Sequence, residues 1–115
     1  MSPADAHAPD QEKDAAPLFA ALGDATRLRL LDRLGADGPL SSTHLGDTAP
    51  VSRQAITKHL DVLAEAGLVR SRRQGRERIW ELEPQRLDEA HRHLERIARQ
   101  WDDALNRLKA LVERP

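Results

Sequence analysis

The stretch that decides the fold is residues 51–69, VSRQAITKHLDVLAEAGLV. Ser52 is a good N-cap and Gly67 is typical of the position just after a helix, so a helix is predicted between them. Apolar residues gather on one side of this helix: Ala55, Ile56, Leu60 and Leu63. Polar residues occupy the other side: Arg53, Gln54, Thr57, Lys58 and Asp61. We therefore expect one face to cover a core and the other to face outward.

A shorter helix and a tight turn are predicted before this segment. Residues 42–47 form a weak helix candidate, because Gly46 lies inside it, and residues 48–50 make the turn. A helix, a three-residue turn and a second helix with a polar outer face form the pattern of a helix-turn-helix.

Two more helices are expected upstream. One opens at Pro17 and stops at Gly23, since proline suits the first turn of a helix and glycine its end. The next is N-capped by Asp24 and ends at Gly35, and a loop follows over residues 36–39.

Downstream of the helix-turn-helix the apolar period changes to that of strands. Residues 68–72 and 76–82 are two strand-like runs around a turn, where Gly75 can supply a positive φ. We expect Trp80 or Ile79 to anchor this hairpin to the helices, because an isolated hairpin is only marginally stable. A basic hairpin directly after a helix-turn-helix is typical of a wing.

The last element, residues 84–112, contains no glycine and no proline after Pro84. Its apolar residues form a stripe over nearly four heptads, which needs a partner surface because a small domain cannot cover about 40 Å of helix. A symmetric dimer would cover it. The predicted dimer interface comprises Leu18, Leu22, Leu87, Leu94, Ile97, Trp101, Leu105 and Leu108.

Composition and charge narrow the class of protein. The 115 residues carry a net charge of −1, but residues 52–80 hold seven bases against three acids, a net charge of +4. Zero cysteines exclude disulfides and thiolate chemistry. No signal or membrane segment, nucleotide loop or catalytic motif is present, so we expect a cytoplasmic protein that is not an enzyme.

Residues 1–16 are expected to be a disordered acidic arm, and residues 17–115 a single domain, mainly α with a small β-hairpin.

The candidate contacts to double-stranded DNA lie on the second helix of the helix-turn-helix and on the wing. Gln54 can pair with adenine and Arg53 with guanine, while Lys58 suits a phosphate. His59 is ambiguous, because it lies between core positions and is as suited to a structural role as to a phosphate contact. The predicted set is Ser52, Arg53, Gln54, Thr57, Lys58, His59, Arg72, Arg73 and Arg76.

Three segments together resemble the ArsR/SmtB family of bacterial winged-helix repressors: LFAALGDATRLRLLDRL, VSRQAITKHLDVLAEAGLV and RSRRQGRERIWEL. The resemblance covers about residues 17–113 and implies a homodimer, joined through its N- and C-terminal helices, that binds a palindromic operator and represses transcription. Ala25 stands where many relatives have proline.

The metal-sensing motifs of that family do not match. Ser41, Ser42 and Thr43 stand where thiolate sensors carry Cys-x-Cys, and hydroxyls are poor ligands for soft metals. On the last helix His91 has chelate spacing with Asp88 or Glu95, but the second ligand pair of zinc sensors is missing, so neither a metal nor a cofactor is expected. Two alternatives stay open: a zinc-responsive repressor with a degenerate site, and a protein-interaction module that uses the long helix.

Overall fold

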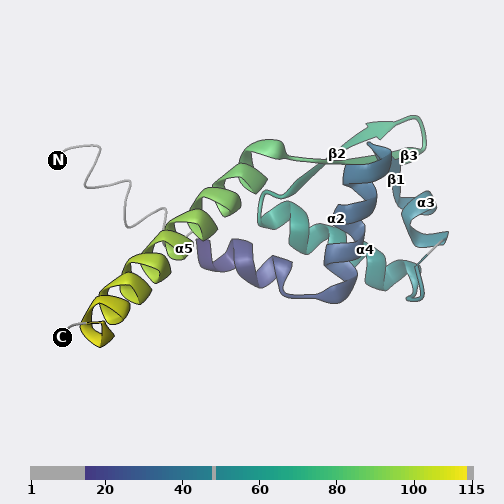
Figure 1. Cartoon of the computed structure of the whole chain (residues 1–115). Coiled ribbons are helices and arrows are strands. Elements are labelled where there is room, and N and C mark those ends of the chain that lie inside the picture. Colours follow the sequence, from purple (N-terminus) through teal and green to yellow (C-terminus); the bar gives the residue numbers. More distant parts are fainter. Residues whose placement is uncertain (1–14, 48, 114–115) are drawn as a thin grey trace.

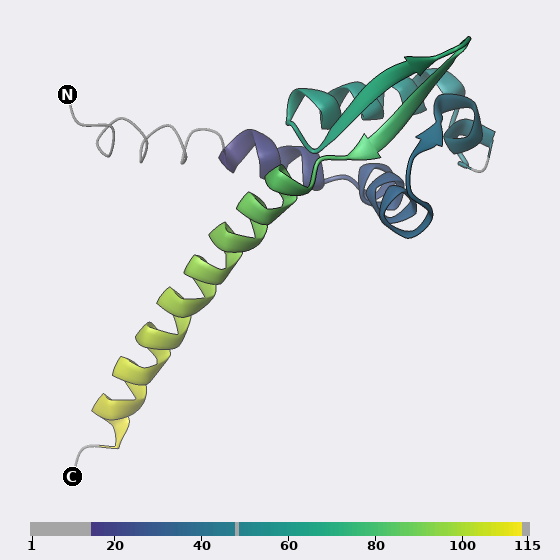
Figure 2. The ribbon, with the colours of Figure 1, turned by 90° about the horizontal axis from the view of Figure 1, so that it is seen from above.

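The computed structural model describes residues 15–47 and 49–113 and shows a mainly helical protein with a small antiparallel sheet. The first helix covers residues 15–22. The remaining elements, in chain order, are α2 (Ala25–Asp37), β1 (Leu40–Ser41), α3 (Ser42–Asp47), α4 (Arg53–Glu65), β2 (Val69–Gln74), β3 (Glu77–Leu82) and α5 (Pro84–Val112). In Figure 1 the helices before β2 gather into one body beside the sheet. Figure 2 shows α5 leaving that body as a long rod, with the β2–β3 hairpin reaching out on the opposite side.

The predicted acidic arm falls mostly outside the described residues. Of its sixteen positions only Ala15 and Ala16 are described, and both are helical, so the first helix extends at least two residues before Pro17.

Local capping sets where α2 and α4 begin. The Asp24 carboxylate accepts a hydrogen bond from the amide of Arg27, and the Ser52 hydroxyl accepts one from the amide of Ala55, 3.0 and 3.1 Å long. Each bond satisfies an amide that has no partner inside its helix. Both N-caps that the sequence predicts are therefore confirmed.

The predicted end of α2 at Gly35 is wrong, and the loop predicted over residues 36–39 is confined to Gly38 and Pro39. The helix continues to Asp37, and the residue with positive φ that closes it is Gly38, at +79°, whose amide donates to Leu34. A glycine inside a helix costs only about 1 kcal/mol, which tertiary packing can override. A Cβ atom at Gly35 would lie 3.6 Å from the side chain of Leu82, the last residue of β3.

The sheet has three strands rather than two. The two-residue strand β1 pairs antiparallel with β3, which also pairs with β2, so that the order is β1-β3-β2. Trp80, on the central strand, pairs with Leu40 on one side and with Ser71 on the other. Its side chain is only 1% exposed, which confirms Trp80 as the anchor of the hairpin. The additional strand, β1, therefore joins the wing to the segment directly before α3, the first helix of the helix-turn-helix.

The core lies between the helices and the inner end of the sheet. Ile56, Leu60 and Leu63 of α4 are buried there, as the apolar side of that helix predicts. Leu18 of the first helix is also in this core, with 1% of its surface exposed. Its predicted place in a dimer interface is wrong, because a side chain enclosed within one protomer cannot contact a second.

The long helix α5 contributes little to the core. Ala90 is its one buried residue among those that the structure describes, and Leu87 packs partly against the core. Beyond that point the stripe is uncovered: Leu94, Ile97, Trp101, Leu105, Leu108, Leu111 and Val112 are all exposed.

Candidate nucleic-acid interface

The first part of the candidate interface is the polar face of α4, defined here as Arg53, Gln54, Thr57 and Lys58. All four side chains are exposed. They occupy the first turn and a half of a helix whose opposite side is held in the core by three buried apolar residues. This arrangement presents the start of the helix to the outside while fixing its orientation.

Arg53 already has an intramolecular partner. Its Nη2 lies 3.0 Å from Oδ1 of Asp47, at the end of α3, so the ion pair spans the turn between the two helices. Both side chains are mostly exposed, and such pairs contribute at most about 1 kcal/mol. The pair can therefore hold Arg53 near the surface and still exchange for a nucleic-acid acceptor. The sequence did not predict this ion pair, because Asp47 and Arg53 are six positions apart and lie on different helices.

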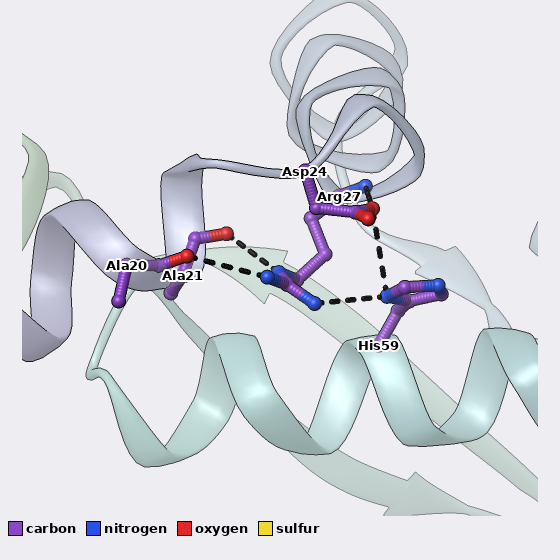
Figure 3. Close-up of polar contacts among 5 residues, drawn as sticks. All are labelled: Ala20, Ala21, Asp24, Arg27 and His59. Carbon is purple, nitrogen blue, oxygen red and sulfur yellow. Dashed lines mark hydrogen bonds and ion pairs between the residues drawn. The ribbon is translucent and has the colours of Figure 1, made fainter.

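His59 is placed differently from the polar face. Its side chain is 22% exposed and lies against the start of α2, where Nδ1 is 3.2 Å from Nη1 of Arg27 and 3.7 Å from Oδ2 of Asp24 (Figure 3). Of the two roles that the sequence left open, this geometry favours the structural one. Ser52 is exposed, but its hydroxyl is occupied as the N-cap of α4.

The second part is the tip of the wing, defined here as Arg73 and Arg76. The two flank Gly75, whose φ of +64° allows the tight turn, and both are exposed. Among residues 15–47 and 49–113 neither makes an ion pair. Their charges are therefore available to an external anion such as a phosphate.

The other wing arginines are engaged within the hairpin. Arg70 bonds to Glu81 and Glu83, and the bond to Glu81 raises the pKa of Arg70. Arg72, predicted as a DNA contact, also reaches Glu81, at 3.4 Å. The Arg70–Glu81 pair joins β2 to β3, since the two residues are partners in the antiparallel register.

Arg78 has partners of a different kind from those of Arg70 and Arg72. It donates to the hydroxyl of Ser71, and its guanidinium stacks 4.8 Å from the centre of the Trp80 ring. This charge therefore lies over the hairpin rather than at its tip.

A hydrogen bond that the sequence did not suggest joins the wing to α3. The indole Nε1 of Trp80 donates to the hydroxyl of Ser42, 2.7 Å away. Because Ser42 opens α3 and Trp80 lies in the central strand, the bond fixes the sheet against the helix-turn-helix. Ser42 is one of the three hydroxyl residues at the position of the thiolate motif, and the structure gives it this packing role.

The candidate metal ligands on α5 are paired with their neighbours. His91 Nε2 lies 2.7 Å from Oε1 of Glu95, and Asp88 pairs with Arg92. In the part of the chain that the structure describes, no three His, Cys, Asp or Glu residues are grouped so as to hold a metal ion. Nor is any helix in these ranges long and apolar enough to cross a membrane.

Comparison with known proteins agrees with this geometry. A family model described as a helix-turn-helix domain matches residues 22–72. The HTH-type transcriptional regulator Rv2034 of Mycobacterium tuberculosis is 39% identical over 95 residues, which cover 83% of this chain and 85% of the relative.

Solved structures extend the likeness to the whole fold. An ArsR-like transcriptional regulator from Rhodococcus sp. RHA1 superposes with a TM-score of 0.77 at 40% identity, covering 90% of this chain and 97% of the other. A homodimeric winged helix-turn-helix DNA-binding domain from Mycobacterium bovis superposes with a TM-score of 0.60 over 93% of each chain. At 23% identity this second likeness concerns the fold alone.

Proposed function

Because the chain belongs to the ArsR family of winged helix-turn-helix transcriptional regulators, we propose that it acts as a homodimeric repressor on a palindromic operator. The polar face of α4 would read base edges in the major groove, and the tip of the wing would bind phosphates or the minor groove beside it. The observation that carries this proposal is that both sets of side chains are exposed on one folded body while their supporting residues are buried.

The uncovered stripe on α5 supports the homodimer. Seven large apolar residues between Leu94 and Val112 are exposed along α5 in the single chain. Exposed apolar stripes of this size on folded proteins mark interaction sites. A second copy of the same helix offers a complementary surface and closes the assembly with two-fold symmetry. Two-fold symmetry in the protein is in turn matched by a palindromic site in the DNA.

We propose that release from DNA does not depend on a metal. The hydroxyls at the thiolate position serve the fold, since Ser41 accepts from the amide of His44 and Ser42 accepts from Trp80. His91 and its acidic neighbour supply two ligands at most, whereas zinc sites use four. The inducing signal would then be an organic ligand or a protein partner.

Binding to the chain's own upstream DNA, measured at about 50 and about 200 mM salt, tests this function. Lys58, Arg73 and Arg76 supply three candidate phosphate contacts in each protomer, so a dimer would make about six and lose roughly a thousandfold in affinity over that range. We expect the same affinity with a chelator and with added zinc.

Two other results would change the proposal. Release by zinc would mean that His91 and its neighbours form a sensor site in the assembled dimer. Absence of binding to any DNA would contradict the repressor and favour an interaction module that docks another protein on α5.

A further inference from the structure

One side chain, Arg27, connects the first helix to α4. Its Nε donates to the carbonyl oxygen of Ala21 at 2.6 Å, and its Nη2 to that of Ala20 at 3.2 Å. Its Nη1 lies 3.2 Å from Nδ1 of His59 in the middle of α4. Figure 3 shows the guanidinium between the end of the first helix and α4, with all three bonds in place; α4 is called the recognition helix below, because it carries the proposed contacts to bases.

The contact with His59 requires one protonation state of the ring. A guanidinium has only donors, so Nδ1 must accept and cannot carry a proton. A neutral imidazole with its proton on Nε2 meets this condition, and an imidazolium, in which both nitrogens are donors, does not. Protonation of His59 would also place two cations side by side.

A different partner for the protonated ring is already present. Oδ2 of Asp24 lies 3.7 Å from the same Nδ1, and in the neutral state the two atoms cannot bond because both are acceptors. The amide of Arg27 donates to this carboxylate and lowers the pKa of Asp24, which therefore stays ionised. A protonated His59 would turn from Arg27 to Asp24, so the two contacts are alternatives.

The charged groups in contact with the ring come from α2 and its N-cap. The residues one turn before and after His59 on α4 are uncharged: Ala55, Ile56, Val62 and Leu63. The first helix contributes backbone carbonyls through Arg27, and the start of α2 contributes Asp24 and Arg27 themselves. In the described ranges these two side chains are the charged partners that contact His59.

The first helix also contacts α5. The rings of Phe19 and His93 lie 5.4 Å apart, centre to centre. Packed contacts therefore run from α5, through the first helix and Arg27, to the recognition helix. A continuous path of this kind can carry a change in one element to another when it has two discrete arrangements.

We propose that Arg27 is a positioning residue, which fixes the recognition helix against the first helix, and through it against the dimer-forming helix α5, only while His59 is neutral, so that acid pH weakens DNA binding. The inference rests on the proposed function, since it concerns the spacing of two recognition helices in a dimer. Two half-sites one helical turn apart tolerate little change in that spacing.

The test compares affinity for one operator duplex at pH 7.5 and pH 5.5, at constant salt. We expect the wild type to lose roughly tenfold, a modest coupling between two parts of a protein. In His59→Asn the side-chain oxygen replaces Nδ1 as acceptor but does not titrate, so its ratio of affinities at the two pH values should stay near one. Arg27→Lys keeps the charge but cannot make all three bonds, so it should bind weakly at both pH values. Arg29→Lys, the same change at an exposed position of α2, is the matched control and should follow the wild type.

The outcomes separate this inference from the proposed function. If His59→Asn loses affinity in acid as the wild type does, the inference is overturned, whether or not Arg27→Lys folds. Equal behaviour of Arg27→Lys and Arg29→Lys would overturn it as well. A wild type that binds no DNA at either pH would instead overturn the proposed function, and the inference with it.

Discussion

Replacing Trp101 with glutamate should convert the dimer into monomers and lower operator affinity by at least about a hundredfold. Trp101 lies in the middle of the uncovered stripe on α5 and is 66% exposed in the single chain. Large aromatic residues at the centre of an interface commonly carry much of its binding energy, and a buried carboxylate without a partner adds a large penalty. A monomer can place only one recognition helix on the operator, so it loses the second half-site.

Sedimentation equilibrium and a DNA titration on the same samples check this prediction. Gln100→Glu is the matched control, because it adds the same charge at the neighbouring exposed position, which does not belong to the stripe. The control should remain dimeric and bind as the wild type does. A Trp101→Glu protein that still dimerises would show that the partner surface lies elsewhere.

Substitutions on α4 and at the tip of the wing should have different effects. Arg53→Ala or Gln54→Ala should relax base preference, since each bidentate contact to a base contributes about 1–3 kcal/mol of discrimination. Arg73→Ala/Arg76→Ala should weaken binding to all sequences alike. This double variant removes two of the proposed phosphate contacts from each protomer, and the slope of log affinity against log salt should become shallower by about 0.9 for each phosphate that is no longer neutralised.

Titrations against the operator and a scrambled duplex, each at three salt concentrations, separate these effects. Arg70→Ala is the control for the wing, because it removes one charge from the same hairpin where the arginine is held by Glu81 and Glu83. We expect a smaller effect from it than from either arginine at the tip. A wing variant that changes base preference alone would contradict this division of roles.

The parts of the fold that were predicted correctly depend on local signals. The N-cap at Ser52, the helix end before Gly67 and the apolar side of α4 each lie within one or two turns of helix, where sequence neighbours decide the geometry. The turn glycine Gly75 and the anchor Trp80 follow in the same way from a short strand pattern. Together they indicated the winged helix-turn-helix.

The errors concern contacts between distant segments. The strand β1 has two residues and exists because β3 offers it a free edge, and Gly35 continues a helix because packing overrides its propensity. Leu18 has the apolar character of an interface residue, but its burial depends on how the first helix lies on the core.

The same limit applies to the candidate site. Arg72 and Arg73 are adjacent arginines, and the sequence offers no reason to treat them differently. In the structure Arg72 reaches Glu81 on the neighbouring strand and is engaged there, whereas Arg73 is at the tip of the wing. His59 likewise faces Arg27, thirty-two residues away in the sequence.

The central claim is that two copies of this chain place two recognition helices on one DNA site. A hydroxyl-radical footprint on the chain's own upstream DNA, with the dimer in excess, tests it most directly. We expect two protected segments related by two-fold symmetry, with centres about 10 base pairs apart or a multiple of that spacing. A single protected segment, or uniform weak protection along the fragment, would contradict the account.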